Sequence, residues 1–552
     1  MAVRAITEGT GITAMASHAA AEDCRSDNKL GQHYGFCGQT LTLGLLLFQV
    51  MPVSAGVWDI VPRISVAEIF TDNIDLEPDN EQSALITEIT PGISMTGEGG
   101  RFKGALDYQM QNFISSEFGG YTSTIHQLDA DSTTELVNNL FFFDADSRMG
   151  QAVINADDTI SLSNYSDNRN RTDVFSYTLS PFVTPHFANY ADGLLRYSYS
   201  EVMYGKDGSS NGVNRSGASD STIQRIEASL VNGAFFNQLS WYANYSQRDI
   251  GRDSSSDDSF EEANGETRYR LTRTFSLVAQ AGWTNDDFET GRDIDNGTYW
   301  AVGGFWQPSR FYSLEALTGN NLTTATASLY PTVRTALVVN YRDRNVGLNP
   351  GKIWTGNFTH RTRRTTWRAG YLEDTTTTQE QALLEDQGFL PIDPTTGLPN
   401  PNPQPGDVVV EVPLPPVVSL SDETIERKRA SGTLGVNTGK TGIRLSVFHE
   451  KRDFQESGEQ DTTRGASGSW DWRFAPRTNW ILTASWQRIE RDDSVNSGAS
   501  DRDFWYIQPQ LRRQIRRYLD GSLTYRFVRQ DSEDDRNDYD ENSVIARVTA
   551  YF

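Results

Sequence analysis

The sequence is poor in cysteine, in histidine and in long apolar runs, and it has fewer basic than acidic residues. Two cysteines and six histidines occur among 552 residues, and 49 Lys and Arg stand against 73 Asp and Glu, a formal net charge of −24. No apolar run reaches the about 18 residues that a transmembrane helix requires. The acidic balance argues against nucleic acid as a partner, because phosphates require a basic surface.

Aromatic residues, in contrast, are abundant. The chain has 12 Trp, 22 Tyr and 27 Phe, and 37% of its residues are hydrophobic. A disordered acidic chain has too few apolar groups to form a core, so this content excludes one. The aromatic residues must therefore be buried in a core or face a membrane.

The first 55 residues are typical of an export signal preceded by an unusually long stretch. Both cysteines, Cys24 and Cys37, precede the apolar segment Leu41–Val50, which is followed by the small residues Val53-Ser54-Ala55. This order is that of a signal-peptide core and its cleavage site, although a short buried helix is the alternative for the apolar segment. A start codon placed too far upstream would explain the long stretch. We predict that residues 1–55 are a signal peptide with such an extension and that residues 56–552 are the mature protein, which contains no cysteine.

Apolar and polar residues alternate along segments of roughly 10–14 residues, the length that a transmembrane β-strand needs. The segment Arg101–Asn112 shows the pattern. One face carries Phe102, Gly104, Leu106, Tyr108 and Met110, and the other carries mainly polar or charged residues. Because successive side chains of a strand point to opposite faces, we assign the first face to lipid and the second to a wet lumen. Strands of a soluble sandwich would be shorter, about 5–6 residues.

Short and long connections alternate between these segments. The short ones include Gly97–Gly100 and Pro331–Arg334, and the long ones are acidic, such as Asp253–Glu262 and Asp531–Glu541. Basic residues gather beside the short turns, as in Arg512–Arg517. The alternation predicts short periplasmic turns at one end of a barrel and long extracellular loops at the other.

The strand number follows from the alternation and from parity. A chain that starts and ends on the same side of the membrane needs an even number of strands. A segment around Gln151–Asn164 completes the alternation if it is counted as a strand. We therefore predict an all-β fold, a transmembrane antiparallel up-and-down β-barrel of about 24 strands, with about 22 as the alternative.

Two further segments are informative. The stretch Glu385–Asp422 is rich in proline, which favours extended chain without ladder pairing. We expect an extracellular loop there, either spread over the surface or folded inward to narrow the channel. The last segment, Val544–Phe552, alternates and ends in phenylalanine, so Phe552 is the candidate signal for the bacterial barrel-assembly machinery. An ordinary amphipathic strand is the alternative.

The mature chain resembles a family of outer-membrane proteins associated with the PEP-CTERM/exosortase system and found beside exopolysaccharide genes. The resemblance is carried by Trp58–Ile74, by Phe175–Pro185 and by Pro391–Arg429. It implies an outer-membrane location in a Gram-negative bacterium and a role in polysaccharide export or surface attachment. None of these segments is catalytic.

Residues that could support catalysis are scarce in the predicted mature chain. Its four histidines have no nucleophile or carboxylate at a predictive spacing, and His449-Glu450 begins a zinc-protease motif without the second histidine. We therefore expect neither an enzyme nor a resident metal or cofactor. Acidic loops such as Asp253–Glu262 could bind calcium, or they could be hydrated or bridge to lipopolysaccharide through divalent ions.

Strand phase nominates residues that line the lumen. They are Arg101, Lys103, Asp107, Arg196, Arg342 and Arg526. Arginines near the short turns could attract an acidic polymer or could pair with aspartates across strands.

The preferred function is a passive exopolysaccharide conduit that works with periplasmic export components. The alternatives are a non-conducting anchor for glycan or sorted proteins and a general porin. The expected partners are outer-membrane lipid, lipopolysaccharide and the barrel-assembly machinery. A TonB-dependent transporter is disfavoured, because such receptors carry an N-terminal plug domain and strands begin here at Trp58.

Overall fold

The computed structural model describes residues 56–115, 122–156, 158–166, 170–205, 219–253, 256–288, 295–348, 350–377, 379–380, 389–392, 408–411, 420–491 and 501–552. The predicted signal peptide and most of the proline-rich stretch lie outside these ranges. No helix within them is long and apolar enough to cross a membrane.

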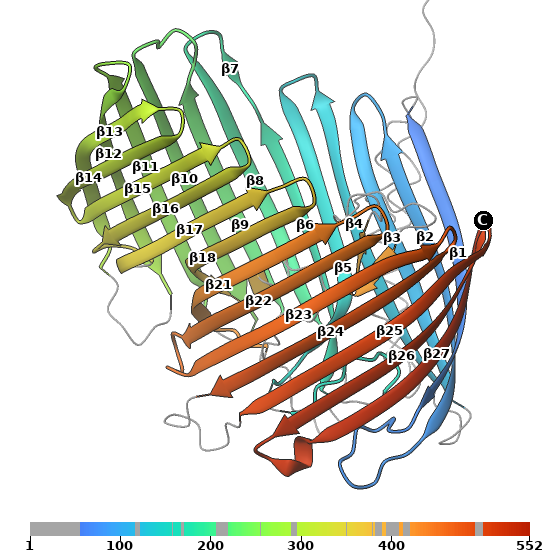
Figure 1. Ribbon diagram of the computed structural model, residues 1–552. Coiled ribbons are helices and arrows are strands. Elements are labelled where there is room, and N and C mark those ends of the chain that lie inside the picture. Colours follow the sequence, from blue (N-terminus) through green and yellow to red (C-terminus); the bar gives the residue numbers. More distant parts are fainter. Residues whose placement is uncertain are drawn as a thin grey trace, which may run out of the picture. The chain divides into compact units, whose positions relative to one another are not determined.

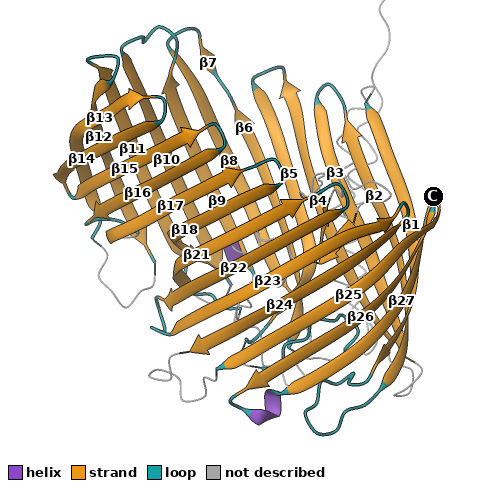
Figure 2. Cartoon of the chain, viewed as in Figure 1, coloured by secondary structure: helices purple, strands orange, loops and turns teal. Residues whose placement is uncertain are grey.

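The described chain is almost entirely β-strand (Figures 1 and 2). The first strands are β1 (Val57–Thr71), β2 (Ala84–Glu98), β3 (Phe102–Ser115), β4 (Thr122–Val137), β5 (Phe141–Val153), β6 (Arg171–Val183), β7 (His186–Phe187), β8 (Ala191–Tyr204), β9 (Ser221–Asn232), β10 (Leu239–Arg252), β11 (Asp258–Arg270), β12 (Phe275–Asp287) and β13 (Gly297–Ser309). The others are β14 (Tyr312–Asn320), β15 (Leu322–Thr332), β16 (Thr335–Arg344), β17 (Gly351–Arg361), β18 (Thr365–Thr377), β19 (Phe389–Ile392), β20 (Val408–Glu411), β21 (Thr424–Asn437), β22 (Thr441–Phe454), β23 (Gln460–Ala475), β24 (Thr478–Arg491), β25 (Arg502–Arg516), β26 (Leu519–Ser532) and β27 (Tyr539–Tyr551). A short 3₁₀ helix, η1 (Asp535–Asn537), precedes β27.

The strands form one closed antiparallel barrel. Each pairs with its neighbours along the chain, and β1 also pairs with β27, from Arg63 opposite Tyr551 to Thr71 opposite Ser543. The main sheet has 25 strands, but β7 is a two-residue strand that only extends the edge of β8, so 24 strands make the wall. Closure removes the exposed edges that would otherwise leave backbone groups unpaired in lipid. The predicted barrel and its count of 24 are confirmed.

The segment Gln151–Asn164, which completed the predicted count, is not a strand of its own. Residues up to Val153 belong to β5, and those that follow form a loop. A small separate hairpin, β19 with β20, occupies part of the proline-rich stretch, where ladder pairing was not expected. Pro391 lies within β19, opposite Val409, and the prolines between the two strands lie outside the described residues.

The outer face of the wall is apolar, with aromatic residues near both ends. On β12, Phe275 lies at the short-turn end and Trp283 lies eight residues along, and both are more than a third exposed. At about 3.4 Å per residue and a tilt of about 40°, this spacing corresponds to about 21 Å. Such paired girdles flank the hydrocarbon layer around membrane barrels, whose apolar band is about 25 Å tall.

The wall is not equally tall all round. Strands β4 and β23 have 16 residues each, whereas β14 has 9 and β16 has 10. One residue, Asn321, joins β14 to β15, with φ of 57°. Asparagine tolerates this left-handed conformation better than most residues, and its Nδ2 donates to the Thr298 carbonyl oxygen (3.1 Å).

The long-loop ends of β11–β16 pack on one another and form what we call the side lobe. Glu262 on β11 accepts from Tyr299 on β13 (2.7 Å) and from Arg344 on β16 (2.8 Å). An apolar cluster surrounds these polar groups, formed by Val278, Tyr299, Ala301, Leu317, Leu322 and Val346. The inner faces of these strands therefore contact each other through both polar and apolar side chains.

Candidate functional site at the long-loop end of the barrel

A loop between β5 and β6 folds into the barrel at its long-loop end. We call residues 154–170 the inward loop; its residues 154–156, 158–166 and 170 are described. The backbone N–H of Ile160 donates to Oε1 of Gln530 on β26 (3.1 Å), and the Ile160 carbonyl accepts from the Tyr539 hydroxyl on β27 (2.5 Å). Arg502 on β25 donates to the Asp158 carbonyl (2.9 Å). The loop thus leaves its own strands and binds the wall formed by β25–β27.

Tyr165 anchors the inward loop to β27 and β3. Its hydroxyl donates to Oε1 of Glu541 (2.9 Å), and its ring meets Phe113 edge-on at 6.5 Å between centroids. The Tyr165 ring is buried in an apolar cluster with Ile69, Ile86 and Ile545. Burial raises the pKa of the Tyr165 hydroxyl, which therefore stays protonated and remains a donor at neutral pH.

The first described residues after β18 also cross the lumen. Oε1 of Glu380 accepts from Arg225 on β9 (2.9 Å) and from Arg248 on β10 (2.5 Å), and its side chain is 6% exposed. Arg248 also lies over the Phe260 ring, 4.2 Å from its centroid. Seven strands, β11 to β17, separate β10 from β18 in the wall. This contact, which we call the Glu380 bridge, therefore spans a chord of the barrel.

The connection between β18 and β21 also crosses the lumen at its other end, just before β21. Asp422, just before β21, accepts from the backbone N–H and the hydroxyl of Ser219 (2.8 and 2.6 Å) and from Gln379 (2.8 Å). The Thr424 hydroxyl donates to Asp258 of β11 (3.1 Å), which also forms a buried ion pair with Arg252 (2.6 Å). Side chains at the ends of β9–β11 thus bind side chains at the ends of β18 and β21, and these contacts narrow the lumen at this end.

The two inward-folded connections also contact each other. The Leu420 N–H donates to the Ile154 carbonyl (3.1 Å), and the Leu420 side chain packs against Val174, Val202 and Tyr204. The sequence left open whether the proline-rich connection spreads over the surface or folds inward. Its described roots fold inward. Sequence reasoning missed the inward loop because Gln151–Asn164 was counted as a strand.

Four of the six residues nominated for the lumen make contacts consistent with the inner face. Asp107 forms a bidentate ion pair with Arg63 of β1 (2.6 and 2.7 Å). Arg196 pairs with Asp144 (2.9 Å), and its guanidinium lies over the Phe182 ring. Arg526 is 7% exposed and donates to Gln508 (3.0 Å). Arg342 lies on β16 between Thr324 and Ile353. Their role toward a ligand stays a prediction.

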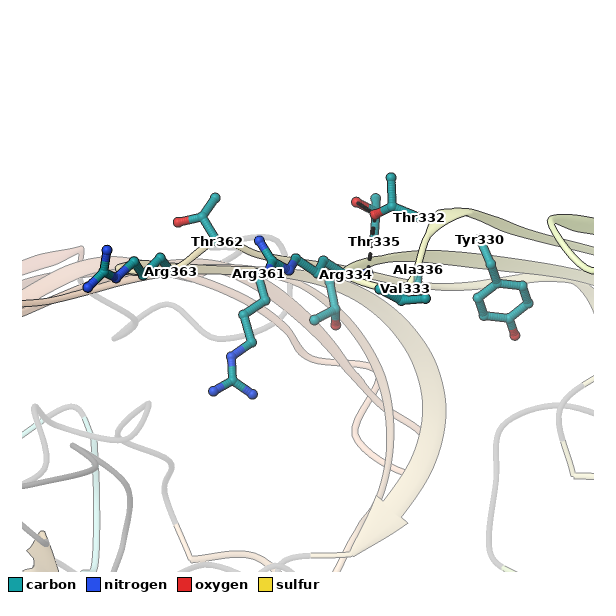
Figure 3. Close-up of a pocket in the computed structure, with 10 residues that line it drawn as sticks. Tyr330, Thr332, Val333, Arg334, Thr335, Ala336, Arg361, Thr362 and Arg363 are labelled. Carbon is teal, nitrogen blue, oxygen red and sulfur yellow. Dashed lines mark hydrogen bonds between the residues drawn. The ribbon is translucent and has the colours of Figure 1, made fainter.

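The other two nominated residues lie at the short-turn end. Arg101 lies in the turn between β2 and β3, and Lys103 is exposed beside Glu98 (3.5 Å). An open depression of about 740 Å³ lies farther round this rim, between the β15–β16 and β17–β18 turns (Figure 3). It is lined by threonines and by Arg334, Arg361 and Arg363. Figure 3 shows Arg361 pointing to the opposite side of the ribbon from Thr362.

The described residues do not assemble a metal or catalytic site that we can identify. Across the described ranges, no three His, Cys, Asp or Glu side chains come together as metal ligands would. His126 hydrogen-bonds to Tyr108 (2.7 Å), and His186 pairs with Asp192 on the exposed rim. The site therefore consists of the barrel mouth and the connections that cross it.

The comparison with solved structures finds receptors and an iron transporter at low sequence identity. The siderophore receptor PirA from Acinetobacter baumannii matches with 8% identity and a TM-score of 0.42, over 89% of this chain and 80% of that one. The FrpB iron transporter from Neisseria meningitidis matches with 13% identity and a TM-score of 0.43, over 89% and 81%. A mutant of the ferric enterobactin receptor PfeA from Pseudomonas aeruginosa matches with 10% identity and a TM-score of 0.40, over 90% and 80%.

The protein is a closed β-barrel with an apolar outer face, the architecture of outer-membrane proteins. No protein-family model matches the chain, and no curated protein matches it. The likeness to the three structures concerns the course of the chain, and the ligands in their titles are those of the proteins named.

The predicted passive exopolysaccharide conduit is wrong, and so are the anchor and general-porin alternatives. A passive polymer conduit needs a continuous opening, whereas Glu380, Asp422 and Tyr165 tie inward connections across this lumen. The argument against a receptor relied on a missing plug, but loops of the barrel itself provide an obstruction here.

Proposed function

We propose that the protein is a ligand-gated outer-membrane transporter. In this proposal the long-loop end faces the outside of the cell, the inward loop and the Glu380 bridge hold the mouth closed, and a ligand opens it by displacing them. The Glu380 bridge is the observation that carries the proposal. It is a contact between side chains rather than a backbone ladder, so it can break while the barrel wall stays intact.

The energetics of the bridge support a gate. One carboxylate that accepts from two arginines gains charge-assisted hydrogen bonds, but two arginines facing each other without it would repel. Hydrogen bonds to charged groups contribute about 1.5–3 kcal/mol each. A ligand that supplies comparable contacts could therefore shift the mouth between closed and open, because about 1.4 kcal/mol changes such an equilibrium tenfold.

Two earlier expectations remain part of the proposal. The resemblance to the PEP-CTERM/exosortase-associated family stays a prediction about the setting in which the transporter works. The barrel-assembly machinery stays the expected assembly partner: Phe552 follows β27 and is 74% exposed, and its backbone N–H donates to the Pro62 carbonyl (2.9 Å).

The experiment is a conductance measurement in planar bilayers with the variant Glu380→Gln. The wild-type protein is expected to be mostly closed. The variant is expected to open about ten times more often, since it loses about 1.5 kcal/mol of charge-assisted bonding at the bridge. The pair Arg225→Gln with Arg248→Gln removes the other half of the bridge and should act in the same direction.

Glu423→Gln is the matched control. Glu423 lies at the same loop root, but its carboxylate accepts from Ser457 and Glu456 of a neighbouring connection and does not cross the lumen. It should conduct like the wild type. A wild-type barrel that is steadily open, or folded bridge variants that stay as closed as the control, would overturn the proposal.

A further inference from the structure

We propose that the lumen wall near the short turns of β17, β18 and β23 binds an anionic ligand that carries carboxylate or phosphate groups. This wall, which we call the arginine strip, carries Arg361, Arg368 and Arg473. The inference deepens the proposed function, because it names the charge of the transported ligand. It rests on the proposed function only in treating the bound anion as the transported ligand.

Strand phase places the three side chains on the inner face. Trp367 precedes Arg368 on β18, and Trp472 precedes Arg473 on β23; both tryptophans are on the outer face and more than a third exposed. Neighbouring residues of a strand point to opposite faces, so both arginines point inward. Arg361 follows the same rule on β17, since Trp354, seven residues earlier, is exposed on the outer face.

The strip lies close to the short turns. Arg361 ends β17, Arg368 is the fourth residue of β18, and Arg473 is two residues before the end of β23. Two other inner-face arginines extend the strip, Arg444 on β22 and Arg512 on β25. Arg368 and Arg444 are near enough for their charges to repel each other.

The three arginines of the strip differ from arginines at the long-loop end of the lumen, because no ion pair in the part of the chain that the structure describes neutralises their positive charge. At the long-loop end, Arg252 and Arg452 are buried and paired with carboxylates. Arg361, Arg368 and Arg473 are exposed, and within the described ranges their guanidinium groups form no hydrogen bond or ion pair. Asp471 lies beside Arg473 and Arg512, and Asp520 pairs with Arg512 (2.7 Å). A guanidinium is well shaped to bind carboxylate or phosphate through two parallel hydrogen bonds.

The opposite wall strengthens the case for an anion. Aspartates gather on β3–β5, where Asp107 lies opposite Asp129 and Asp131 lies opposite Asp146. Like charges directly opposite each other destabilise a sheet. Strands β4 and β17 are twelve places apart in the ring of 24. Arg63 and Arg196 pair with Asp107 and Asp144, and Arg148 lies near Asp131 and Asp146, so arginines offset part of this negative charge. The aspartates that remain in excess disfavour an anion at this wall and so favour its binding at the strip.

The test is calorimetric titration of the full chain in detergent with inorganic pyrophosphate. We expect wild-type binding that weakens with salt. The triple variant Arg361→Gln, Arg368→Gln and Arg473→Gln should bind about tenfold more weakly or worse, because several charge-assisted contacts are lost together. The heat-induced shift of the folded band on a denaturing gel verifies that each variant is a closed barrel.

A second triple variant is the control for net charge. Arg363→Gln, Arg364→Gln and Arg477→Gln remove the same number of charges from the adjoining turns and should leave the affinity within about twofold. Absence of wild-type binding, or equal loss in both triples, would overturn the inference. A loss confined to the turn variants would also overturn it, since binding would then lie on the rim beside lipid head groups.

The outcome is separable from that of the gating experiment. The strip lies at the short-turn end, away from the Glu380 bridge, so pyrophosphate can be titrated whether or not the mouth opens. Anion binding with a bridge that does not gate would retain the strip and remove the gate.

Discussion

Tyr165 contributes both a hydrogen bond and a buried aromatic ring to the contact between the inward loop and the barrel wall. Its hydroxyl donates to Glu541, a carboxylate that is 2% exposed and has the Thr71 hydroxyl (2.9 Å) as a second donor. A buried acceptor that loses a donor costs about 1–3 kcal/mol. The loop therefore depends on a hydrogen bond to a strand that is far away in the sequence.

Replacing Tyr165 with phenylalanine is expected to loosen the inward loop without unfolding the barrel. A loss of about 1.5 kcal/mol should speed amide hydrogen exchange in residues 158–166 about tenfold. Tyr525→Phe is the control, because that hydroxyl donates to Asn542 on the outer face (2.6 Å). Unchanged exchange in the Tyr165 variant would show that the loop is held by other contacts.

The pH dependence of this docking follows from the same hydroxyl. Burial raises the pKa of Tyr165 above the about 10 of an exposed tyrosine. A pKa that is higher in the docked state means that the contribution is complete below pH about 10 and is lost as the pH rises toward the docked value. Exchange in residues 158–166, after correction for intrinsic rates, should therefore not change between about pH 6 and 9.

At the scale of elements, the side lobe depends on a glycine beneath an aromatic ring. A Cβ added to Gly282 of β12 would lie 2.3 Å from the Tyr299 ring carbon Cζ and 2.4 Å from its hydroxyl. Tyr299 could not then keep its hydrogen bond to Glu262. Gly282 therefore allows both the close approach of β12 and β13 and the hydrogen bond of Tyr299 to Glu262.

Gly282→Val is expected to destabilise the barrel by about 1–3 kcal/mol through overpacking. Gly442→Val is the control on β22, where an added Cβ would meet nothing within 4 Å. The measurement is the temperature at which the folded gel band converts to the unfolded one. Equal midpoints for the two variants would contradict the packing that we describe.

The strands could be predicted from the sequence and the paths of the connections could not. A two-residue alternation is local, so it assigns Leu106 and Asp107 to opposite faces without knowledge of the rest of the chain. The inward loop is decided by partners such as Glu541, which is 376 positions from Tyr165. The sequence also showed that basic residues gather at the short turns. It did not show where β17 ends, and that boundary assigns Arg361 to the strand and Arg363 and Arg364 to the turn.

At the scale of the whole molecule, the two faces of the wall should respond oppositely to charge. Leu445 of β22 is 49% exposed on the outer face, and Ser446 follows it on the inner face. Leu445→Arg is expected to cost about 2–4 kcal/mol, because an arginine is forced into hydrocarbon. Ser446→Arg should cost little, and denaturant unfolding in lipid vesicles measures both. Equal costs would contradict the assignment of the faces.

The unequal height of the wall has a consequence for the surrounding lipids. At about 3.3 Å per residue and a tilt of about 40°, the nine residues of β14 rise about 23 Å, whereas the 16 residues of β23 rise about 40 Å. A bilayer adjusts its thickness to the protein that it meets, at a modest cost for each ångström of mismatch. On β23, however, the exposed Arg464 pairs with Glu490 on the outer face, so the apolar outer band of this strand ends near Ala466 and spans about as many residues as β14. The extra length of the tall strands therefore rises beyond the hydrocarbon into the polar head groups, and on the low side the wall ends close to the hydrocarbon boundary.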